Sequence, residues 1–457
     1  MKISKEKLAQ DFKCAAKQNE KQWICDWTEI VSQPSVSASG EGVLECCKQI
    51  VSKMKGIGLE PVMLDVAPYP AIFAQQGHDP EKITVLIYAH YDVMPAGDRS
   101  LWNSEPFEPT FIDGKMYARG SADNKSPLMA HLEAYDFLMK QYGELPVNLK
   151  FLFEGAEESG SKGLPEFLKA HEDLFSADLV FFSDGPKNEA NIPIVALGAK
   201  GNITIGLTLT TMKTDAHSRY APILPSAAWE LVELLGKLKT GDHVNVPGFY
   251  DGIVPPTEKE LEILHALPPI DSDMEKIFGT MPRYPKELGY YVQLNTTPTF
   301  NLKQIHSGEG AGVVTCQATA SIDIRLVEGM DPDDIFQKVK RYILELGYTN
   351  VEFSYKGGTY PSKTPVENQY VPVIAQVTQE VYGSHVIYPC RPSSAPDYLW
   401  TKILGLPAIQ VRWSDPDSNN HAPNEHMTVS EYIRGIELTV KVLHALGQWN
   451  EADNDNE

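Results

Sequence analysis

Three stretches of sequence decide the fold: KITVLIYAHYD (82–92), NLKFLFEGAEE (148–158) and DLVFFSDG (178–185). Each stretch is an apolar run that ends in acidic or histidine side chains. Apolar residues recur at helical spacing between these runs, over 126–142 and 164–175. Buried strands that alternate with helices are typical of a mostly parallel sheet covered by helices on both faces. The three stretches therefore predict an α/β fold.

The polar residues at the ends of the three runs predict a functional site. They are His90, Asp92, Glu157, Glu158 and Asp184. In open α/β sheets, ligands bind at the edge where the carboxyl ends of the strands lie. Three such strand ends are expected to meet at that edge, so we expect these side chains to lie close together.

The pattern of apolar residues changes after about residue 197. The runs 202–213 and 319–326 alternate between apolar and polar residues, as half-exposed strands do. The segments 226–238 and 332–347 have the spacing of amphipathic helices. This part of the chain therefore reads as an α+β region.

The last part of the chain resembles the first third again. Residues 370–383 predict a helix, and 407–413 predict a buried strand followed by a polar loop. We therefore predict that an α+β domain is inserted into the α/β domain. The expected segments are 1–196 and 361–457 for the α/β catalytic domain and 197–360 for the inserted dimerisation or lid domain.

Composition narrows the classes of function. The chain has 457 residues, 42% apolar residues and a formal charge of −21, without a basic stripe, so we expect no nucleic acid or membrane partner. The first residues lack the apolar core of a secretory signal, and no apolar run is long enough to span a membrane. Six cysteines fit neither a disulfide framework nor a zinc-knuckle spacing, which favours a cytoplasmic location.

The residue types at the predicted edge suit a hydrolytic site with two metal ions. Adjacent carboxylates at a buried strand end, such as Glu157 and Glu158, need a cation or a shared proton. Two dications close together need a bridging carboxylate, terminal nitrogen and oxygen ligands, and an open face for water. Taken singly, Asp123 before a helix is more often an N-cap. His421 lies in a loop after the last buried strand. A serine nucleophile in a G-x-S-x-G motif is absent.

The chain resembles the co-catalytic zinc exopeptidases, the family of aminoacylase, carnosinase and succinyl-diaminopimelate desuccinylase. Cytosolic non-specific dipeptidase is the branch that it resembles most. The segments that carry the resemblance are 88–125, EGAEESGS (154–161), FFSDG (181–185), DAHSRY (215–220), DIRLVEGM (323–330) and NNHAPNE (419–425).

The resemblance implies a role for each site residue. His90 and Asp184 would bind one metal ion, Glu158 and His421 the other, and Asp123 both. Glu157 would be the general base and acid, and Asp92 would orient His90. In the inserted domain, which would form a homodimer, His217 would reach the partner's site and Arg325 would hold the substrate carboxylate. The implied ions are two Zn²⁺ per chain, with Mn²⁺ or Co²⁺ as alternatives.

The chain also departs from the family pattern. Ser126 stands where the family usually has glycine, and the Lys-Thr pair expected ahead of Arg325 is missing. CRPSSAP (390–396) replaces a glycine-rich substrate loop, which leaves Arg391, Ser393 and Ser394 without a role.

The expected function is hydrolysis of the amide bond of dipeptides or similar small peptides. Two other functions stay open at this point. One is deacylation or desuccinylation of N-acyl amino acids on the same metal core, and the other is a catalytically silent peptide-binding protein. Retention of Glu157 beside a full ligand set argues against the silent protein.

Overall fold

The computed structural model describes residues 3–309 and 312–448, which form two compact units. The first unit comprises Met1–Leu197, Thr364–Pro389 and Leu399–Glu457. The second unit comprises Gly198–Lys363 and Cys390–Tyr398.

The short segment 390–398 differs from the sequence interpretation, which assigned it to the α/β domain. It belongs to the second unit because its backbone forms hydrogen bonds with residues of that unit. The amide of Lys200 donates to the carbonyls of Arg391 and Ser393 at 3.2 and 3.1 Å.

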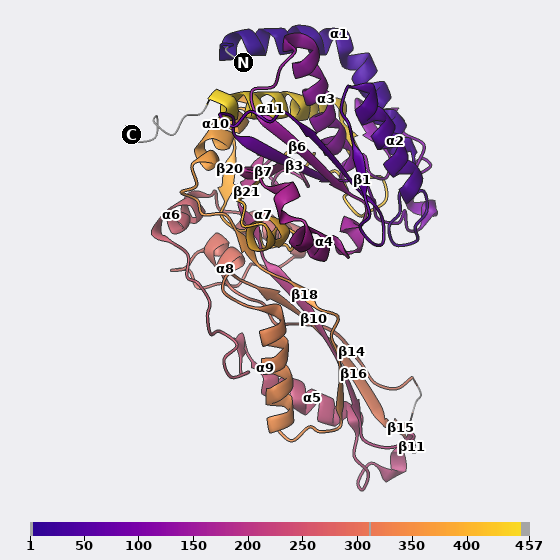
Figure 1. Ribbon diagram of the computed structural model, residues 1–457. Coiled ribbons are helices and arrows are strands. Elements are labelled where there is room, and N and C mark those ends of the chain that lie inside the picture. Colours follow the sequence, from indigo (N-terminus) through magenta and orange to yellow (C-terminus); the bar gives the residue numbers. More distant parts are fainter. Residues whose placement is uncertain (1–2, 310–311, 449–457) are drawn as a thin grey trace. The chain divides into compact units, whose positions relative to one another are not determined.

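An eight-stranded sheet forms the centre of the first unit (Figure 1). Its four inner strands, β6, β3, β7 and β21, are mutually parallel. On the outside, β2 runs antiparallel to β6, and β8 runs antiparallel to β21. The predicted α/β fold with a mostly parallel sheet is therefore confirmed, with antiparallel strands added at its margins. In spatial order the strands are β1 (Val62–Leu64), β2 (Ala71–Gln76), β6 (Asn148–Glu154), β3 (Thr84–His90), β7 (Leu179–Phe182), β21 (Ala408–Arg412), β8 (Ile194–Ala196) and β20 (Val386–Tyr388).

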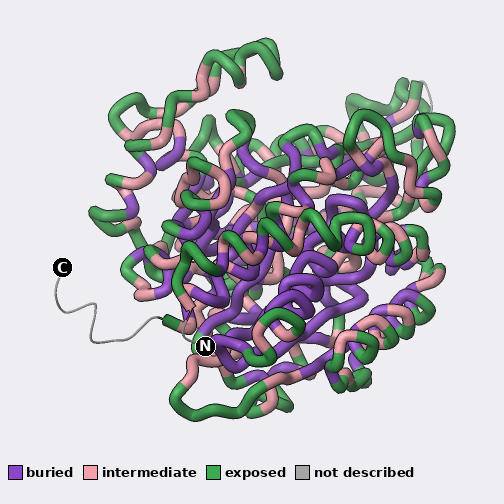
Figure 2. Tube along the Cα trace, turned by 90° about the horizontal axis from the view of Figure 1, so that it is seen from above, coloured by how far each residue is buried: buried purple, intermediate pink, exposed green. Residues whose placement is uncertain are grey.

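Helices pack on both faces of this sheet. On one face Phe181 of β7 lies edge-on to His131 of α3, and on the other Tyr88 of β3 packs against Trp400. Because both faces are covered, the inner strands are buried along almost their whole length (Figure 2). The first face carries α1 (Lys5–Ser32), α2 (Val43–Gly56), α3 (Lys125–Tyr142), α10 (Tyr370–Tyr382) and α11 (Val429–Gln448), and the second carries α4 (Leu164–Ala170) and two irregular turns, η3 (Glu172–Phe175) and η5 (Leu399–Ile403).

A small antiparallel sheet completes the first unit. It is formed by β4 (Thr110–Ile112), β5 (Lys115–Tyr117) and β22 (His426–Thr428), so that it joins two segments far apart in the sequence. Within the described ranges, no helix of the chain has the length and apolar character needed to cross a membrane.

An antiparallel sheet with helices on one face forms the second unit. The central strand β10 (Gly201–Thr210) pairs with β16 (Gln317–Leu326) along its whole length. Alternate residues of both strands are buried against α5 (Ala227–Leu238) and α9 (Pro332–Glu345), which explains their alternating sequence pattern. The Asp331 side chain caps α9, and Pro332 fills its first turn.

The remaining elements of the second unit are short. The edges of its sheet are β14 (Asn301–His306), β17 (Val351–Ser354) and β18 (Gly358–Thr359). The other strand pairs and helices described in this unit are β9 (Gly198–Ala199) with β19 (Ser362–Lys363), β11 (Ala216–His217) with β15 (Val313–Val314), β12 (Lys239–Thr240) with β13 (His243–Val244), α6 (Glu258–Ala266), α7 (Asp271–Phe278) and α8 (Tyr290–Thr296).

Candidate metal centre

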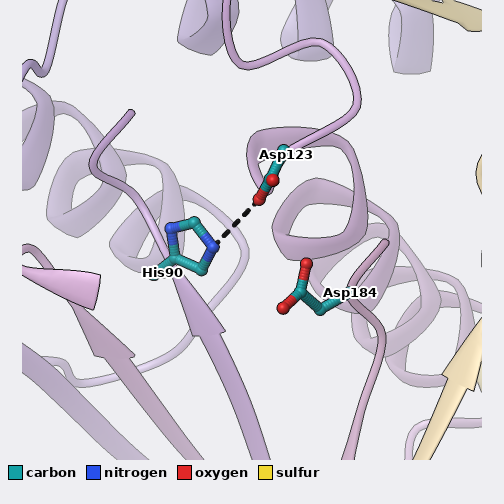
Figure 3. A group of neighbouring side chains, drawn as sticks. All are labelled: His90, Asp123 and Asp184. Carbon is teal, nitrogen blue, oxygen red and sulfur yellow. Dashed lines mark ion pairs between the residues drawn. The ribbon is translucent and has the colours of Figure 1, made fainter. Parts of the chain in front are cut away.

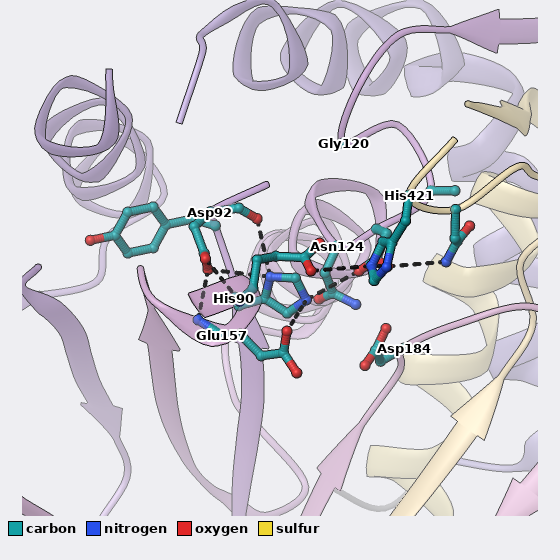
Figure 4. Close-up of polar contacts among 12 residues, drawn as sticks. His90, Asp92, Gly120, Asn124, Glu157, Asp184 and His421 are labelled. Atoms are coloured by element: carbon teal, nitrogen blue, oxygen red, sulfur yellow. Dashed lines mark hydrogen bonds and ion pairs between the residues drawn. The ribbon is translucent and has the colours of Figure 1, made fainter. Parts of the chain in front are cut away.

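The ends of three parallel strands place most of the predicted site residues. His90 is the last residue of β3, and Asp92 follows it by two positions. Glu157 and Glu158 lie in the turn η2 (Glu157–Ser159) just after β6, and Asp184 lies just after β7. Because β3 lies between β6 and β7 in parallel register, these ends share one edge of the sheet (Figure 4).

Two loops bring Asp123 and His421 to the same edge. Asp123 precedes α3, and His421 lies between β21 and β22. Asp123 Oδ1 is 3.2 Å from His90 Nε2, and Asp123 Oδ2 is 3.1 Å from His421 Nε2 (Figures 3 and 4). One carboxylate therefore faces a different histidine with each of its oxygens.

These residues form two groups that could each hold a metal ion. The first is His90, Asp123 and Asp184, and the second is Asp123, Glu158 and His421. Within each group the ligand atoms lie within 4.8 Å of one another. Imidazole nitrogen with carboxylate oxygen is a donor set that suits zinc and related divalent ions. Since Asp123 belongs to both groups, the arrangement fits a pair of ions that share it.

The buried atoms of His90 support this fit. The ring is almost fully buried, and among the described residues no atom forms a well-aligned hydrogen bond with Nε2. The other ring nitrogen, Nδ1, lies 3.1 Å from the carbonyl oxygen of Asp92. In metal-binding histidines one ring nitrogen is held by a protein oxygen, and the other faces the metal site. His90 has this arrangement, because its Nε2 faces a group of carboxylates.

The protonation of His421 also fits a cation site. Hydrogen bonds with Asp123 and Glu158 raise the pKa of His421 to about 10. Glu158 Oε2 is 3.1 Å from the ring Nε2, and the side chain of His421 is 52% exposed. The charged ring thus balances these carboxylates, and it would have to lose its proton when a metal ion binds.

Glu157 belongs to neither ligand group. Its Oε2 lies 4.0 Å from His90 Nε2, and its side chain is 18% exposed. Burial raises the pKa of Glu157 well above its usual range, and the nearby carboxylates of Asp184 and Glu158 add to the effect. A carboxylate with a raised pKa beside a ligand cluster can accept and return a proton.

Asp92 does more than the resemblance implied. Its Oδ1 lies 3.4 Å from His90 Nδ1. The same carboxylate also accepts hydrogen bonds from the backbone amides of Glu157 and Glu158, at 3.1 and 3.0 Å. Asp92 is fully buried, so it holds both the histidine and the turn that carries the two glutamates.

Two residues without a predicted role contact Asp123. Asn420 Nδ2 donates to Asp123 Oδ2 at 3.1 Å, and Glu425 accepts from the Asp123 amide at 2.9 Å. Both lie in the segment 419–425, in which His421 is the predicted metal ligand. Their proximity to His421 in the sequence was the available signal.

His217 and Arg325 belong to the second unit, whereas the residues of the two ligand groups belong to the first. His217 is exposed at the end of β11, and its Nδ1 accepts from the Arg219 amide at 3.2 Å. Arg325, on β16, donates from Nη1 to Ser394 Oγ at 2.8 Å and lies 3.3 Å from Asp323. The roles of His217 and Arg325 therefore stay predictions.

Two of the departures from the family pattern, Ser126 and the loop 390–396, make defined local contacts. Ser126 is buried in the first turn of α3, and its hydroxyl donates to the Ser121 carbonyl. Arg391 forms a buried ion pair with Asp397 at 2.7 Å. That pair binds Arg391 within its own loop, whereas Ser394 lies beside Arg325.

Known proteins resemble this chain in sequence and in fold. The human Beta-Ala-His dipeptidase is 28% identical over 81% of this chain and 76% of its own length. A Cys-Gly metallodipeptidase of Schizosaccharomyces pombe is 26% identical over 98% of this chain and 99% of its own length. The crystal structure of an M20 family metallo-carboxypeptidase from Sulfolobus solfataricus matches with a TM-score of 0.86 and 29% identity, covering 93% of this chain and 99% of that one.

The family comparison covers most of the chain. The model of "Peptidase family M20/M25/M40" matches residues 86–445, a range that contains every predicted site residue. The predicted resemblance and the predicted class of enzyme, a peptide hydrolase, are thereby confirmed. The chain belongs to the peptidase family M20/M25/M40.

Proposed function

We propose that this chain is a dipeptidase that uses two divalent metal ions, with zinc as the first candidate. The observation that carries the proposal is the pair of ligand groups that share Asp123. The human and fission-yeast relatives, both dipeptidases by name, support the choice of a small peptide substrate.

The two groups support a ligand assignment. His90 and Asp184 would hold one ion, Glu158 and His421 would hold the other, and Asp123 would belong to both sites. When bound, the ions polarise the scissile carbonyl and make water acidic enough to attack it near neutral pH.

Glu157 moves the proton in this reaction. It takes a proton from the attacking water and passes it to the leaving amine. Asp92 supports this step because its carboxylate holds the amide of Glu157 at 3.1 Å. The same bonds keep Glu157 and Glu158 in one turn, where one can accept a proton while the other binds metal.

Arg325 is the proposed contact for the free carboxylate of the substrate. A planar guanidinium can hold a carboxylate with two parallel hydrogen bonds. Ser394, 2.8 Å from Arg325 Nη1, adds a hydroxyl beside this position. We therefore propose a role in substrate binding for the loop 390–396, which contains Ser394 and replaces the expected glycine-rich segment.

A homodimer through the second unit is the proposed assembly. Trp229 and Val232 lie three residues apart on the outer face of α5 and are 69% and 46% exposed. Ile223, just before this helix, is 76% exposed. Adjacent exposed apolar residues of this size mark interaction surfaces. A second copy of the chain would cover them and could bring its His217 to the site.

A reducing, cytoplasmic environment is inferred from the cysteines. All six are free, including the adjacent and buried Cys46 and Cys47. Free thiols in this number are typical of proteins outside the oxidising compartments. We expect neither nucleic acid nor a membrane as a partner, because the chain carries a formal charge of −21.

A substrate panel after metal reconstitution tests the proposed function. The metal-free protein is loaded with Zn²⁺, Mn²⁺ or Co²⁺, desalted, and analysed for bound metal. Each form is then assayed with Ala-Ala, Cys-Gly and β-Ala-His, with a tripeptide, and with N-acetyl and N-succinyl amino acids. We expect about two ions per chain, because bridging by Asp123 requires two, and turnover of dipeptides.

Each measurement in this panel can exclude a different candidate function. Stoichiometry that stays at one or zero with all three ions would overturn the paired-metal proposal. Turnover of the N-acyl compounds alone would identify a deacylase, and turnover of the tripeptide alone would exclude a dipeptidase. A protein that binds two metal ions but cleaves none of these compounds would be the catalytically silent peptide-binding protein.

A further inference from the structure

Glu425 is a fully buried carboxylate with four hydrogen-bond donors around it. Its Oε1 accepts from the backbone amides of Ala122 and Asp123, both at 2.9 Å. Its Oε2 accepts from the amide of Gly120 at 3.0 Å and from Arg119 Nη1 at 2.5 Å. The carboxylate therefore organises the whole turn that ends at the shared ligand Asp123.

The same residue also anchors the loop that carries His421. Glu425 directly precedes β22, whose His426 pairs with Tyr117 of β5. Its own carbonyl accepts from the amide of Ala118 at 3.0 Å. One residue thus joins the segment 118–123 to the segment 421–426 through both its backbone and its side chain.

A carboxylate is the group that this position requires. Two oxygens with two lone pairs each can accept all four bonds, and the negative charge is balanced by buried Arg119. A glutamine would present an NH₂ group to backbone N–H donors at one end. Two of the donors would then lose their acceptor inside the protein, which is costly.

We propose that Glu425 is a positioning residue that sets the separation between Asp123 and His421, and so the affinity for the metal ion between them. Asp123 and His421 are two of the three members of the group completed by Glu158, and both lie on the segments that Glu425 joins. The other group, with His90 and Asp184 on strand ends, depends on Glu425 only through Asp123. Loss of Glu425 should therefore weaken the two sites unequally.

The test is a metal titration of Glu425→Gln, and it rests on the proposed two-metal function. The protein is stripped with a chelator and titrated with Co²⁺, and the visible absorption and competition with a chromogenic chelator give an affinity for each equivalent. Residues that hold metal ligands in place typically contribute about 10–100-fold to affinity. We expect one equivalent close to wild type and the other weakened by about this factor.

Glu133→Gln is the matched control. Glu133 is a buried carboxylate of the same unit, paired with Lys53 Nζ at 2.9 Å and absent from both ligand groups. Both variants should lower the melting temperature, but Glu133→Gln should bind both equivalents as wild type does. Equal affinities in Glu425→Gln and wild type, or equal weakening of the two equivalents, would overturn the proposal. A wild-type protein that binds fewer than two ions would overturn the proposed function instead.

Hydrogen exchange on the wild-type protein keeps the proposal testable if Glu425→Gln does not fold. We expect the amides of Gly120, Ala122 and Asp123 to exchange slowly in the metal-free protein, because Glu425 holds them without an ion. Fast exchange of these three amides that becomes slow only after metal is added would show that the ion, and not Glu425, orders the turn.

Discussion

The residues proposed to bind metal and those proposed to bind substrate are held in different ways. His90 and Asp92 are buried at a strand end, and Asp92 ties the ring of His90 to the turn of Glu157. His217, by contrast, is exposed at the end of a two-residue strand. Arg325 stands on an alternating strand, where every second side chain faces outward.

This difference predicts how strongly a substitution in each region should lower activity. A ligand at the end of a buried strand is fixed by the sheet, because the strand cannot move without loss of its ladder and its packing. His217 is exposed, and Arg325 is held by polar contacts with Ser394 and Asp323 on the outward side of a half-buried strand. We therefore expect the largest losses of activity from changes in the first region and smaller, substrate-dependent losses from the second.

The largest effect is expected from the adjacent pair Glu157 and Glu158. Glu157→Gln should lower turnover by about 10²–10⁴-fold or more and leave metal content unchanged, because the side chain transfers a proton without binding metal. Glu158→Gln should lose both turnover and metal, since Glu158 belongs to a ligand group. Metal analysis and initial rates on the same preparations measure both quantities.

The two variants serve as controls for each other because they are neighbours in one turn. Loss of metal to the same extent in both would show that the division of roles within this pair is wrong. Retention of metal in both would remove Glu158 from the ligands.

The central fold could be predicted because its strands have a strong local signal. The strand predicted at 82–92 is β3, and its apolar run is buried on both faces as expected. The short strands β8 and β20, three residues each, carry too little periodicity to be predicted. The antiparallel direction of β8 depends on pairing with β21, which is distant in the sequence.

The second largest effect is expected from His217, and it tests whether the exposed region acts across a dimer. A hydrogen-bond donor to the developing oxyanion contributes about 10²–10³-fold to kcat in comparable sites. His217→Ala should therefore be nearly inactive although its metal content is normal. The second variant in this experiment is Glu157→Ala, which should be inactive because it lacks the group that transfers the proton.

Mixing the two inactive proteins separates action within a chain from action across a dimer. If His217 serves the partner's site, each mixed dimer has one site with both residues intact. Random reassortment makes about half of the dimers mixed, so activity should recover to roughly a quarter of wild type. Subunit exchange is confirmed by a tag on one chain. Exchange without recovery would place His217 in its own chain's site or outside the reaction.

The metal-binding region could be predicted from strand ends, but the network behind it could not. Glu425 contacts the Asp123 amide across about three hundred residues of sequence, and no spacing rule connects them. The position of Ser394 beside Arg325 likewise depends on a loop of the second unit. Contacts between loops arise from the tertiary fold, so the residue types alone do not reveal them.

A smaller, substrate-dependent effect is expected from Arg325. Arg325→Ala should raise KM for dipeptides by about 10–150-fold, equivalent to about 1.5–3 kcal/mol, because a charged hydrogen-bonded contact is lost. The corresponding dipeptide amides lack the carboxylate, so their KM should change much less. Kinetics on matched acids and amides measure the difference. The same change in KM for both series would remove Arg325 from carboxylate binding.

The smallest effect is expected from Ser126, which follows Asp123 by three residues and belongs to neither ligand group. Its hydroxyl donates to the Ser121 carbonyl, so Ser126→Ala should lose one buried hydrogen bond, about 0.5–1.5 kcal/mol of stability. Ser126→Gly, which restores the family's usual residue, should cost more, because glycine in a helix is about 1 kcal/mol less favourable than alanine. Thermal unfolding of the metal-loaded proteins measures both losses of stability.

Metal content and kcat should match wild type in each Ser126 variant, because the strand ends and Glu425 hold the ligands without this bond. A fall in kcat at full metal content would show that the start of α3 contributes to the position of Asp123, and that the region is less rigid than its buried strands indicate.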